Sequence, residues 1–340
     1  MFFRAVHFLR YVNKFWLLCL PMQYDTGCEE MAKYTLKRFF MAIITLLLVA
    51  TLTFVLMNSI PGSPWLSDKT PPVAVQEYLN AKYGLDQPKI VQLGKYLENL
   101  LHGDMGESIK MQKNRPVLTI IKEMFPVSAK LGFFALLWAV LVGVPLGCIA
   151  AYKRGTWVDS LLRVVCTFGV SMPSFVVATL LLRYFSGDFF PSKFDATIGL
   201  RAYFLPCLSL GLYSMCYTAR QARSAMLDAL GQDYIKTARA KGLKNRKIIF
   251  KHALRNALLP VITYLGPQVA FTLCGGFVVE TVFSVPGLGR YFVQSIQNRD
   301  YPLIMGTTIF LAALIIFMNF IVDILYKVAD PRINLAEGDN

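Results

Sequence analysis

The sequence predicts an all-α integral membrane protein with six transmembrane helices, and three observations lead to this fold class. Of the 340 residues, 55% are apolar and only 16% are charged, whereas soluble domains carry about 25% charged residues. So few polar side chains cannot cover a soluble surface of this size. Apolar runs near the length that a bilayer requires, about 20 residues, recur along the chain. The basic residues behind the net charge of +14 cluster beside those runs.

Six apolar runs define the predicted spans. They cover Phe39–Met57, Val127–Tyr152, Leu161–Phe185, Phe204–Ala219, Ala257–Phe283 and Leu303–Tyr326. Lys and Arg are retained in cytoplasmic loops, and basic clusters follow the second, fourth and sixth runs. The largest lies in residues 220–256, where ten basic residues stand against two acidic ones. We therefore expect a multi-pass protein of the cytoplasmic membrane with residues 220–256 and both termini in the cytoplasm.

Residues 58–126 are predicted to form a small extracytoplasmic segment, with an amphipathic helix at Ile90–Leu101. The remaining parts are an N-terminal cytoplasmic extension (1–30), the first transmembrane helix (31–57), a transmembrane core (127–327) that includes the basic loop 220–256, and a cytoplasmic tail (328–340). Two interpretations of residues 1–30 stay open. The extension either lies as a helix in the membrane interface, or is dispensable and precedes a functional start at Met31.

Composition argues against several functional classes. The positive charge could indicate binding to nucleic acid. However, basic residues beside apolar runs are the pattern that sets the orientation of transmembrane helices. The seven cysteines show no Cys-x-x-Cys spacing, and the three histidines complete no ligand pattern. We therefore predict no metal site, no disulfide framework and no nucleic-acid partner. The chain also has no Gly-x-x-x-x-Gly-Lys-Ser/Thr phosphate loop.

The basic loop 220–256 has an internal design that an orientation signal alone does not need. Gly231-Gln232 interrupts a helical pattern, and Asp233 is placed to cap a short helix over Tyr234–Lys241 that Gly242 ends. Asn245 can start a third helix leading into the fifth span. A helix this short needs a packing partner. Either it docks into another protein through its small residues Thr237, Ala238 and Ala240, or the loop packs on itself.

Ordered motifs then show a resemblance to a known family. The run Asp233–Leu243, followed by His252–Pro260, resembles the coupling loop of binding-protein-dependent ABC permeases, in particular the first permease subunit of the peptide and nickel branch. Lys236 and Thr237 stand where the general pattern has Glu and Ala. Further matching motifs, spread over about residues 31–335, are Tyr83–Pro88, Gly103–Ser108, Pro145–Gly147, Ser171–Phe175, Glu280–Gly289, Arg299–Pro302 and Asp330–Arg332.

The resemblance implies the type I ABC importer permease fold and a pore subunit without enzymatic activity of its own. The implied partners are the lipid bilayer, a second homologous permease subunit, two ABC ATPase subunits that bind ATP and Mg²⁺, and an extracytoplasmic substrate-binding protein. This chain itself would hold no cofactor. The implied ATPase-coupling residues are Asp233, Tyr234, Thr237, Ala238, Arg239, Ala240, Lys241, Gly242, His252, Arg255 and Asn256.

Two further groups of residues are candidates within or near the spans. Glu280, Pro286, Gly287, Gly289 and Asp300 are candidates for an outer gate or for docking of the binding protein. The candidates for pore lining are Ser171, Pro173, Ser174 and Gln268, because polar or kinking residues in spans are often functional. Simple helix packing remains the alternative for these four.

The substrate stays open among di- and oligopeptides, nickel chelates, glutathione and antimicrobial peptides. Two other functional classes fit the sequence less well. A secondary transporter requires paired ionisable groups near the midplane or inverted repeats, and neither is evident. A membrane-bound enzyme requires a nucleophile–base pair or a metal constellation, and the sequence shows neither.

Overall fold

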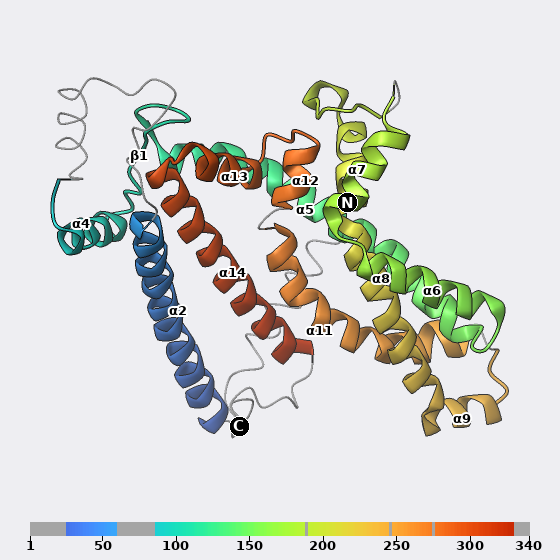
Figure 1. Cartoon of the computed structure of the whole chain (residues 1–340). Helices are drawn as coiled ribbons and strands as arrows, with labels where there is room; N and C mark the ends of the chain where they lie inside the picture. The colour runs from blue at the N-terminus through green and yellow to red at the C-terminus, as the bar shows by residue number, and fades with distance from the viewer. Residues whose placement is uncertain (1–24, 60–85, 188–189, 245–246, 274–275, 330–340) are drawn as a thin grey trace.

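The structure, a computed structural model, describes residues 25–59, 86–187, 190–244, 247–273 and 276–329. This part of the chain is almost entirely helical (Figure 1). Its elements are α2 (Asp25–Ser59), α4 (Lys89–Leu101), β1 (Glu107–Ser108), β2 (Arg115–Pro116), α5 (Val117–Tyr152), α6 (Trp157–Ser171), α7 (Ser174–Phe185), η1 (Ala196–Ile198), α8 (Leu200–Gly231), α9 (Asp233–Ala240), η2 (Ile248–Ala253), α11 (Leu254–Leu273), α12 (Phe277–Val282), α13 (Leu288–Asn298) and α14 (Tyr301–Ala329). The all-α prediction is confirmed.

Helices lie within all six predicted spans, although the fifth, Ala257–Phe283, is divided between α11 and α12. Within the described ranges, four stretches are long and apolar enough to cross a membrane: Leu36–Ser59, Val117–Tyr152, Tyr264–Val282 and Tyr301–Val322. The bent pair of α6 and α7 adds a fifth if it forms one span. The predicted fourth span lies inside α8, which is 32 residues long but less apolar than those four.

Close contact between α5 and α8 forms the centre of the molecule. Small residues recur every fourth position on α5, at Ala135, Ala139, Gly143, Gly147 and Ala151, and so line one face of the helix. A Cβ on Gly147 would lie 2.3 Å from the carbonyl oxygen of Ala219 on α8. Small residues at such spacing let membrane helices approach until their backbones touch.

The predicted third span is not one straight helix. Pro173 separates α6 from α7, and the two helices meet at an angle of 104°. Because a proline disfavours helical backbone in the residue before it, Met172 is extended (φ −77°, ψ 124°). The prediction of a continuous helix over Leu161–Phe185 was therefore wrong at this point.

The first helices differ from their predicted bounds. Helix α2 begins at Asp25 rather than at residue 31, so part of the predicted extension is helical, and residues 1–24 lie outside the described chain. Helix α5 begins at Val117 rather than Val127 and runs through Pro126. Neighbouring groups in a helical membrane protein accommodate the hydrogen bond that a proline removes. The amphipathic helix expected at Ile90–Leu101 is confirmed as α4.

One end of the molecule carries α4, the β1–β2 hairpin, α12 and α13, and the other carries α9 (Figure 1). The two-residue strands β1 and β2 pair antiparallel, with Glu107 opposite Pro116 and Ser108 opposite Arg115. Helix α2 begins, and α14 ends, towards the same end as α9 (Figure 1). The short elements of both ends are therefore held by long helices that cross between them.

Candidate functional site

Helix α9 is the short helix expected in the basic loop, over Asp233–Ala240. Gln232, not Asp233, occupies the N-cap position. Asp233 is the first helical residue, where its negative charge interacts favourably with the positive end of the helix dipole. Its Oδ1 accepts a hydrogen bond from Lys236 Nζ at 2.8 Å. Asp233 therefore supports the helix start by charge rather than by capping it.

The C-terminus of α9 closes in a Schellman motif. Gly242 adopts φ +73°, its N–H donates to the carbonyl of Arg239 at 2.9 Å, and the N–H of Leu243 donates to that of Ala238 at 3.3 Å. This pair of bonds, with a glycine in the left-handed conformation, satisfies carbonyls that a helix end leaves free. The chain therefore leaves α9 in one defined direction.

Helix α9 presents two different faces. Ile235 (0% exposed) and Ala238 are buried in a cluster with Met226 and Ala229 of α8 and Ile248 of η2. The residues on the other face are exposed: Asp233, Tyr234, Lys236, Thr237, Arg239, Ala240, Lys241 and Gly242. The sequence left two alternatives open, docking of this helix into another protein and packing of the loop on its own chain. The structure shows the loop packed on its own chain, with one face of α9 left exposed. Ala238, expected to contact a partner, faces inward instead.

The remaining coupling candidates lie on the helix that follows. The chain forms a π-helical turn over Ile248–Ala253 before α11 begins at Leu254, and such turns are rare and often mark functional positions. His252 is half-buried in this turn, whereas Arg255 and Asn256 are exposed at the start of α11. The predicted helix start at Asn245 lies outside the described residues.

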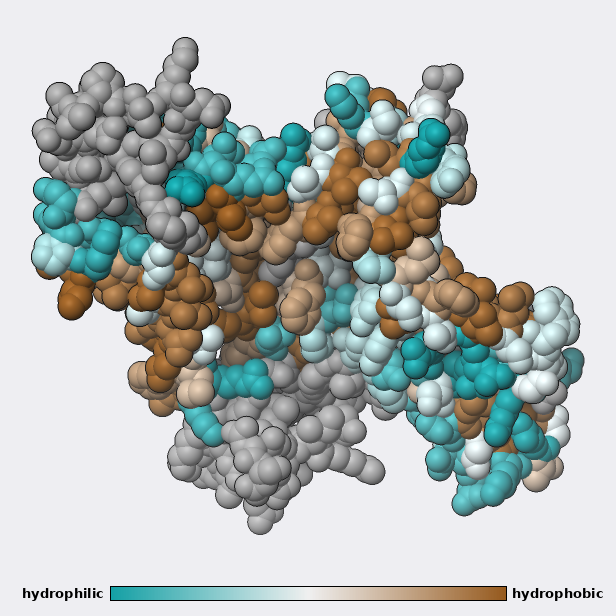
Figure 2. Space-filling view, viewed as in Figure 1, coloured by the Kyte–Doolittle hydropathy of each residue, from teal (hydrophilic) through white to brown (hydrophobic). Residues whose placement is uncertain are grey.

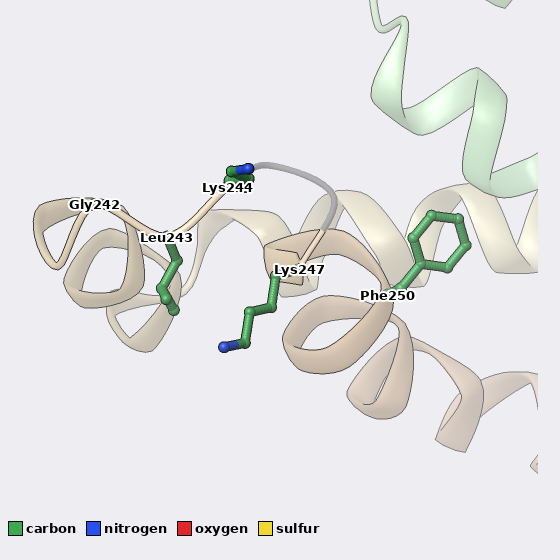
Figure 3. Close-up of a pocket in the computed structure, with 5 residues that line it drawn as sticks. All are labelled: Gly242, Leu243, Lys244, Lys247 and Phe250. Atoms are coloured by element: carbon green, nitrogen blue, oxygen red, sulfur yellow. The ribbon is translucent and has the colours of Figure 1, made fainter.

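An open hollow of about 600 Å³ adjoins the end of α9. Figure 3 shows its five lining residues: Gly242, Leu243 and Lys244 come from the turn after α9, and Lys247 and Phe250 from the next helix. Phe250 is 63% exposed, and in Figure 3 its ring points away from the side chains of Lys244 and Lys247. The surface around α9 is therefore basic with an exposed aromatic ring.

The sequence did not predict a buried ion pair that joins α6 to α8. The carboxylate of Asp159, at the start of α6, is 1% exposed and is bound by the guanidinium of Arg223 on α8. The available signal was a single acidic residue among Lys153, Arg154 and Arg163. Buried charges are nearly always paired, but the sequence could not show which basic residue is the partner.

Glu280, Gly287 and Gly289 meet at the opposite end of the molecule. The Glu280 side chain is fully buried, and its Oε2 accepts a hydrogen bond from the N–H of Arg290 in the first turn of α13 at 3.0 Å. A Cβ on Gly287 would lie 2.5 Å from that oxygen, and one on Gly289 2.9 Å. Glycine is thus required here for the carboxylate to reach the positive end of α13. Pro286 beside them is exposed.

Asp300 lies apart from that cluster, between α13 and α14. Its carboxylate accepts hydrogen bonds from the hydroxyl of Ser108 at 2.5 Å and from the backbone N–H groups of Ile109, Lys110 and Met111 at 3.0–3.1 Å. The side chain is fully buried. Asp300 therefore fastens the segment after β1 to the top of α14.

The candidates for pore lining fall at two places. Ser171, Pro173 and Ser174 are exposed at the break between α6 and α7. Gln268 is half-buried on α11 and donates a hydrogen bond to Ser214 of α8 at 2.8 Å. Within the described residues, no group of three or more His, Cys, Asp or Glu side chains could hold a metal ion.

Comparisons with known proteins agree with this architecture. The family model for the binding-protein-dependent transport system inner membrane component matches residues 143–335, and the model for its N-terminal part matches residues 31–132. A dipeptide transport system permease protein of Bacillus subtilis is 46% identical over 308 residues, covering 90% of this chain and 99% of that protein. An oligopeptide transport system permease protein of Salmonella typhimurium is 42% identical over 305 residues, covering 89% and 99%.

Solved structures are more distant. A chain of a methionine ABC transporter in inward-facing conformations is 17% identical, with a TM-score of 0.46 over 62% of this chain and 97% of that one. The match of the family model to more than half of the chain, and the identity to relatives over nearly all of it, decide the assignment. The chain belongs to the family of binding-protein-dependent transport system inner membrane components.

Proposed function

We propose that this chain is a pore-forming permease subunit of an ATP-driven importer that moves di- or oligopeptides across the cytoplasmic membrane. The observation that carries the proposal is α9, a short helix held on one face by its own chain and free on the other. The names of the dipeptide and oligopeptide relatives, which cover about 90% of the chain, support a peptide as the substrate.

Helix α9 is the part of the chain through which partner ATPases act. An isolated helix of eight residues is unstable in water, so the burial of Ile235 and Ala238 is what maintains it. A force applied to its free face is transmitted through these two side chains to α8 and α11. Tyr234 and Arg239 on the free face supply an aromatic ring and a charge of the kind enriched at protein interfaces.

ATP and Mg²⁺ are bound by two separate ATPase subunits, and a second, homologous permease subunit completes the pore. The α9 end faces the cytoplasm, in agreement with its basic residues, and both termini lie on that side. The start of α2 and the end of α14 lie towards the same end of the molecule as α9, which supports this orientation (Figure 1). The opposite end, with α12, α13 and the exposed Pro286, receives the extracytoplasmic binding protein.

The test is reconstitution of the chain with its second permease subunit, the ATPases and the binding protein in proteoliposomes, followed by uptake of a labelled dipeptide. Uptake is expected only with ATP and all subunits. Arg239→Glu on α9 is expected to abolish ATP-dependent uptake, while Lys95→Glu, the same charge change on exposed α4, leaves it intact. Uptake on a proton gradient without the ATPases would contradict the proposal.

A further inference from the structure

Three tyrosines and a glutamine form one continuous surface where α8 meets α11. We call this set, Tyr213, Tyr217, Tyr264 and Gln268, the tyrosine face. The rings of Tyr217 and Tyr264 stack across the two helices, with centroids 4.0 Å apart and planes at 23°. The ring of Tyr213, one turn before Tyr217 on α8, continues the stack with centroids 6.2 Å apart and planes at 27°.

Hydrogen bonds within α11 and between α11 and α8 hold the tyrosine face in place on its buried side. The hydroxyl of Tyr264 donates to Gln268 Oε1 at 3.2 Å, and Gln268 Nε2 donates to the buried hydroxyl of Ser214 at 2.8 Å. Ring stacking and amide bonding thus hold α8 and α11 in one register. The stack extends outward from these bonds to Tyr213, which is 41% exposed, so the face is rigid and also open at one end.

Helix α2 shows what a lipid-facing surface of this chain looks like. Only 11% of its most apolar stretch is buried within the chain, and the exposed large apolar side chains on it are aliphatic residues, phenylalanines and Met41, among them Leu48, Leu52 and Val55. The hydroxyl of Thr45 on this helix donates to the carbonyl of Met41, four residues earlier, at 2.7 Å. In Figure 2 the surface over α2 is brown, while the middle of the molecule, over α8 and α11, is paler and partly teal.

The tyrosine face differs from α2 in chemistry but lies at membrane depth. Tyr213 stands within the predicted span Phe204–Ala219, and Tyr264 and Gln268 stand within Ala257–Phe283. Polar side chains at such depth are costly against lipid and turn towards the protein interior or a water-filled cavity. An exposed phenol at this position therefore indicates contact with water or a polar occupant rather than with acyl chains.

We propose that the tyrosine face lines the path through which the transported peptide crosses the membrane. The inference rests on the proposed function, because the occupant is the peptide. Tyrosine presents an apolar ring with a polar hydroxyl and has few rotatable bonds, so a stack of tyrosines can contact varied side chains and backbone amides without selecting one sequence. Two stacked rings held by Gln268 give a path wall that does not collapse when empty.

Accessibility to water tests the placement of the face. In the reconstituted complex with all seven cysteines of this chain replaced, Tyr213→Cys is compared with Leu52→Cys, a control of similar exposure on α2 (53%). A charged, membrane-impermeant methanethiosulfonate reagent is expected to modify Tyr213→Cys several-fold faster in at least one nucleotide state, and a saturating dipeptide with its binding protein is expected to slow that reaction.

Equal labelling of the two variants in a complex that transports dipeptide would overturn the inference and leave the proposed function intact. Burial of Tyr213→Cys against the second permease subunit, seen as a cross-link to that subunit without any protection by dipeptide, would also overturn it. Peptide uptake is measured before labelling, so a complex that moves no peptide contradicts the proposed function separately.

Side-chain substitutions test the chemistry of the face. Tyr213→Leu is expected to raise the KM for dipeptide uptake about fivefold, in line with the loss of one aromatic contact, whereas Tyr213→Phe retains most of the affinity. Leu52→Ala on α2 is the control. An unchanged KM in Tyr213→Leu, together with unchanged uptake in Tyr264→Leu, would overturn a role in peptide contact.

Discussion

Arg223 on α8 donates two parallel hydrogen bonds to the carboxylate of Asp159 on α6, from Nε to Oδ1 at 2.7 Å and from Nη2 to Oδ2 at 2.9 Å. The N–H of Gly155 adds a third bond to the same carboxylate at 3.1 Å. This bidentate geometry is among the strongest that proteins form between side chains. The pair ties the loop before α6 to the part of α8 that leads into α9.

Asp159→Asn is expected to destabilise the purified complex strongly. The substitution leaves the half-buried guanidinium of Arg223 without a counter-charge, and a hydrogen bond to a charged group contributes about 1.5–3 kcal/mol. The thermal unfolding midpoint measures the loss. Glu123→Gln, which removes an ion pair with Arg115 at a half-exposed site, is the control and is expected to change the midpoint little. Equal midpoints for the two variants would contradict the assignment.

Gly147→Val is expected to disrupt the contact between α5 and α8. Its Cβ would lie 2.3 Å from the carbonyl oxygen of Ala219 and 2.9 Å from the backbone nitrogen of Arg223, so the helices must separate. Overpacking of this kind costs about 1–3 kcal/mol, and yield of folded protein and thermal midpoint both measure it. Gly94→Ala on α4, where no atom lies within 4 Å of the added Cβ, is the control and should leave the midpoint unchanged or higher. If Gly147→Val is as stable as Gly94→Ala, the close contact of α5 with α8 does not require glycine at position 147.

Gly242→Val is expected to uncouple ATP hydrolysis from transport. No atom lies within 4 Å of the position of its Cβ, so the cost comes from the left-handed backbone at φ +73°, which a β-branched residue adopts only with strain. Gly242→Asn is the matched variant, since asparagine tolerates this conformation and should preserve the C-terminal turn of α9. The ratio of peptide transported to ATP hydrolysed is the measurement. Equal coupling in both variants would exclude backbone conformation as the reason for the glycine.

Asp300→Asn is expected to release the segment after β1. The charged carboxylate accepts three backbone N–H bonds and one hydroxyl bond, and an amide NH₂ in place of one oxygen would face those donors. Hydrogen bonds to a charged group contribute about 1.5–3 kcal/mol each. Hydrogen exchange of Ile109, Lys110 and Met111 is expected to accelerate.

Asp104→Asn, four residues before Ser108, provides the comparison for Asp300→Asn. Asp104 is exposed and accepts one bond from the N–H of Gly106 at 2.8 Å, so its substitution should affect exchange at residues 109–111 only slightly. If exchange there is the same in Asp300→Asn as in the unmodified chain, Asp300 does not hold this segment.

The sequence predicted the helical class, the places of the spans and the short helix of the basic loop, because those features depend on local composition. Apolar runs, the interruption at Gly231-Gln232 and the glycine after Lys241 each act within a few residues. Pro173 indicated a possible break in the third span, but the angle between α6 and α7 depends on how the two helices pack against the rest of the chain. The N-cap is Gln232 and not Asp233, a shift of one position, because the ends of helices are set by contacts beyond the local pattern.

By itself, the sequence determined that this chain is a membrane protein with a basic loop containing a short helix, and its motifs carried the family resemblance. Only the tertiary structure decided which residues meet: Asp159 with Arg223, Glu280 with the start of α13, Asp300 with residues 108–111, and the tyrosines of α8 with those of α11. These partners lie up to 192 residues apart in the chain. The physical reason is that a charge or hydroxyl removed from water must find a partner, while the packing of helices, and not local pattern, determines which partner is within reach.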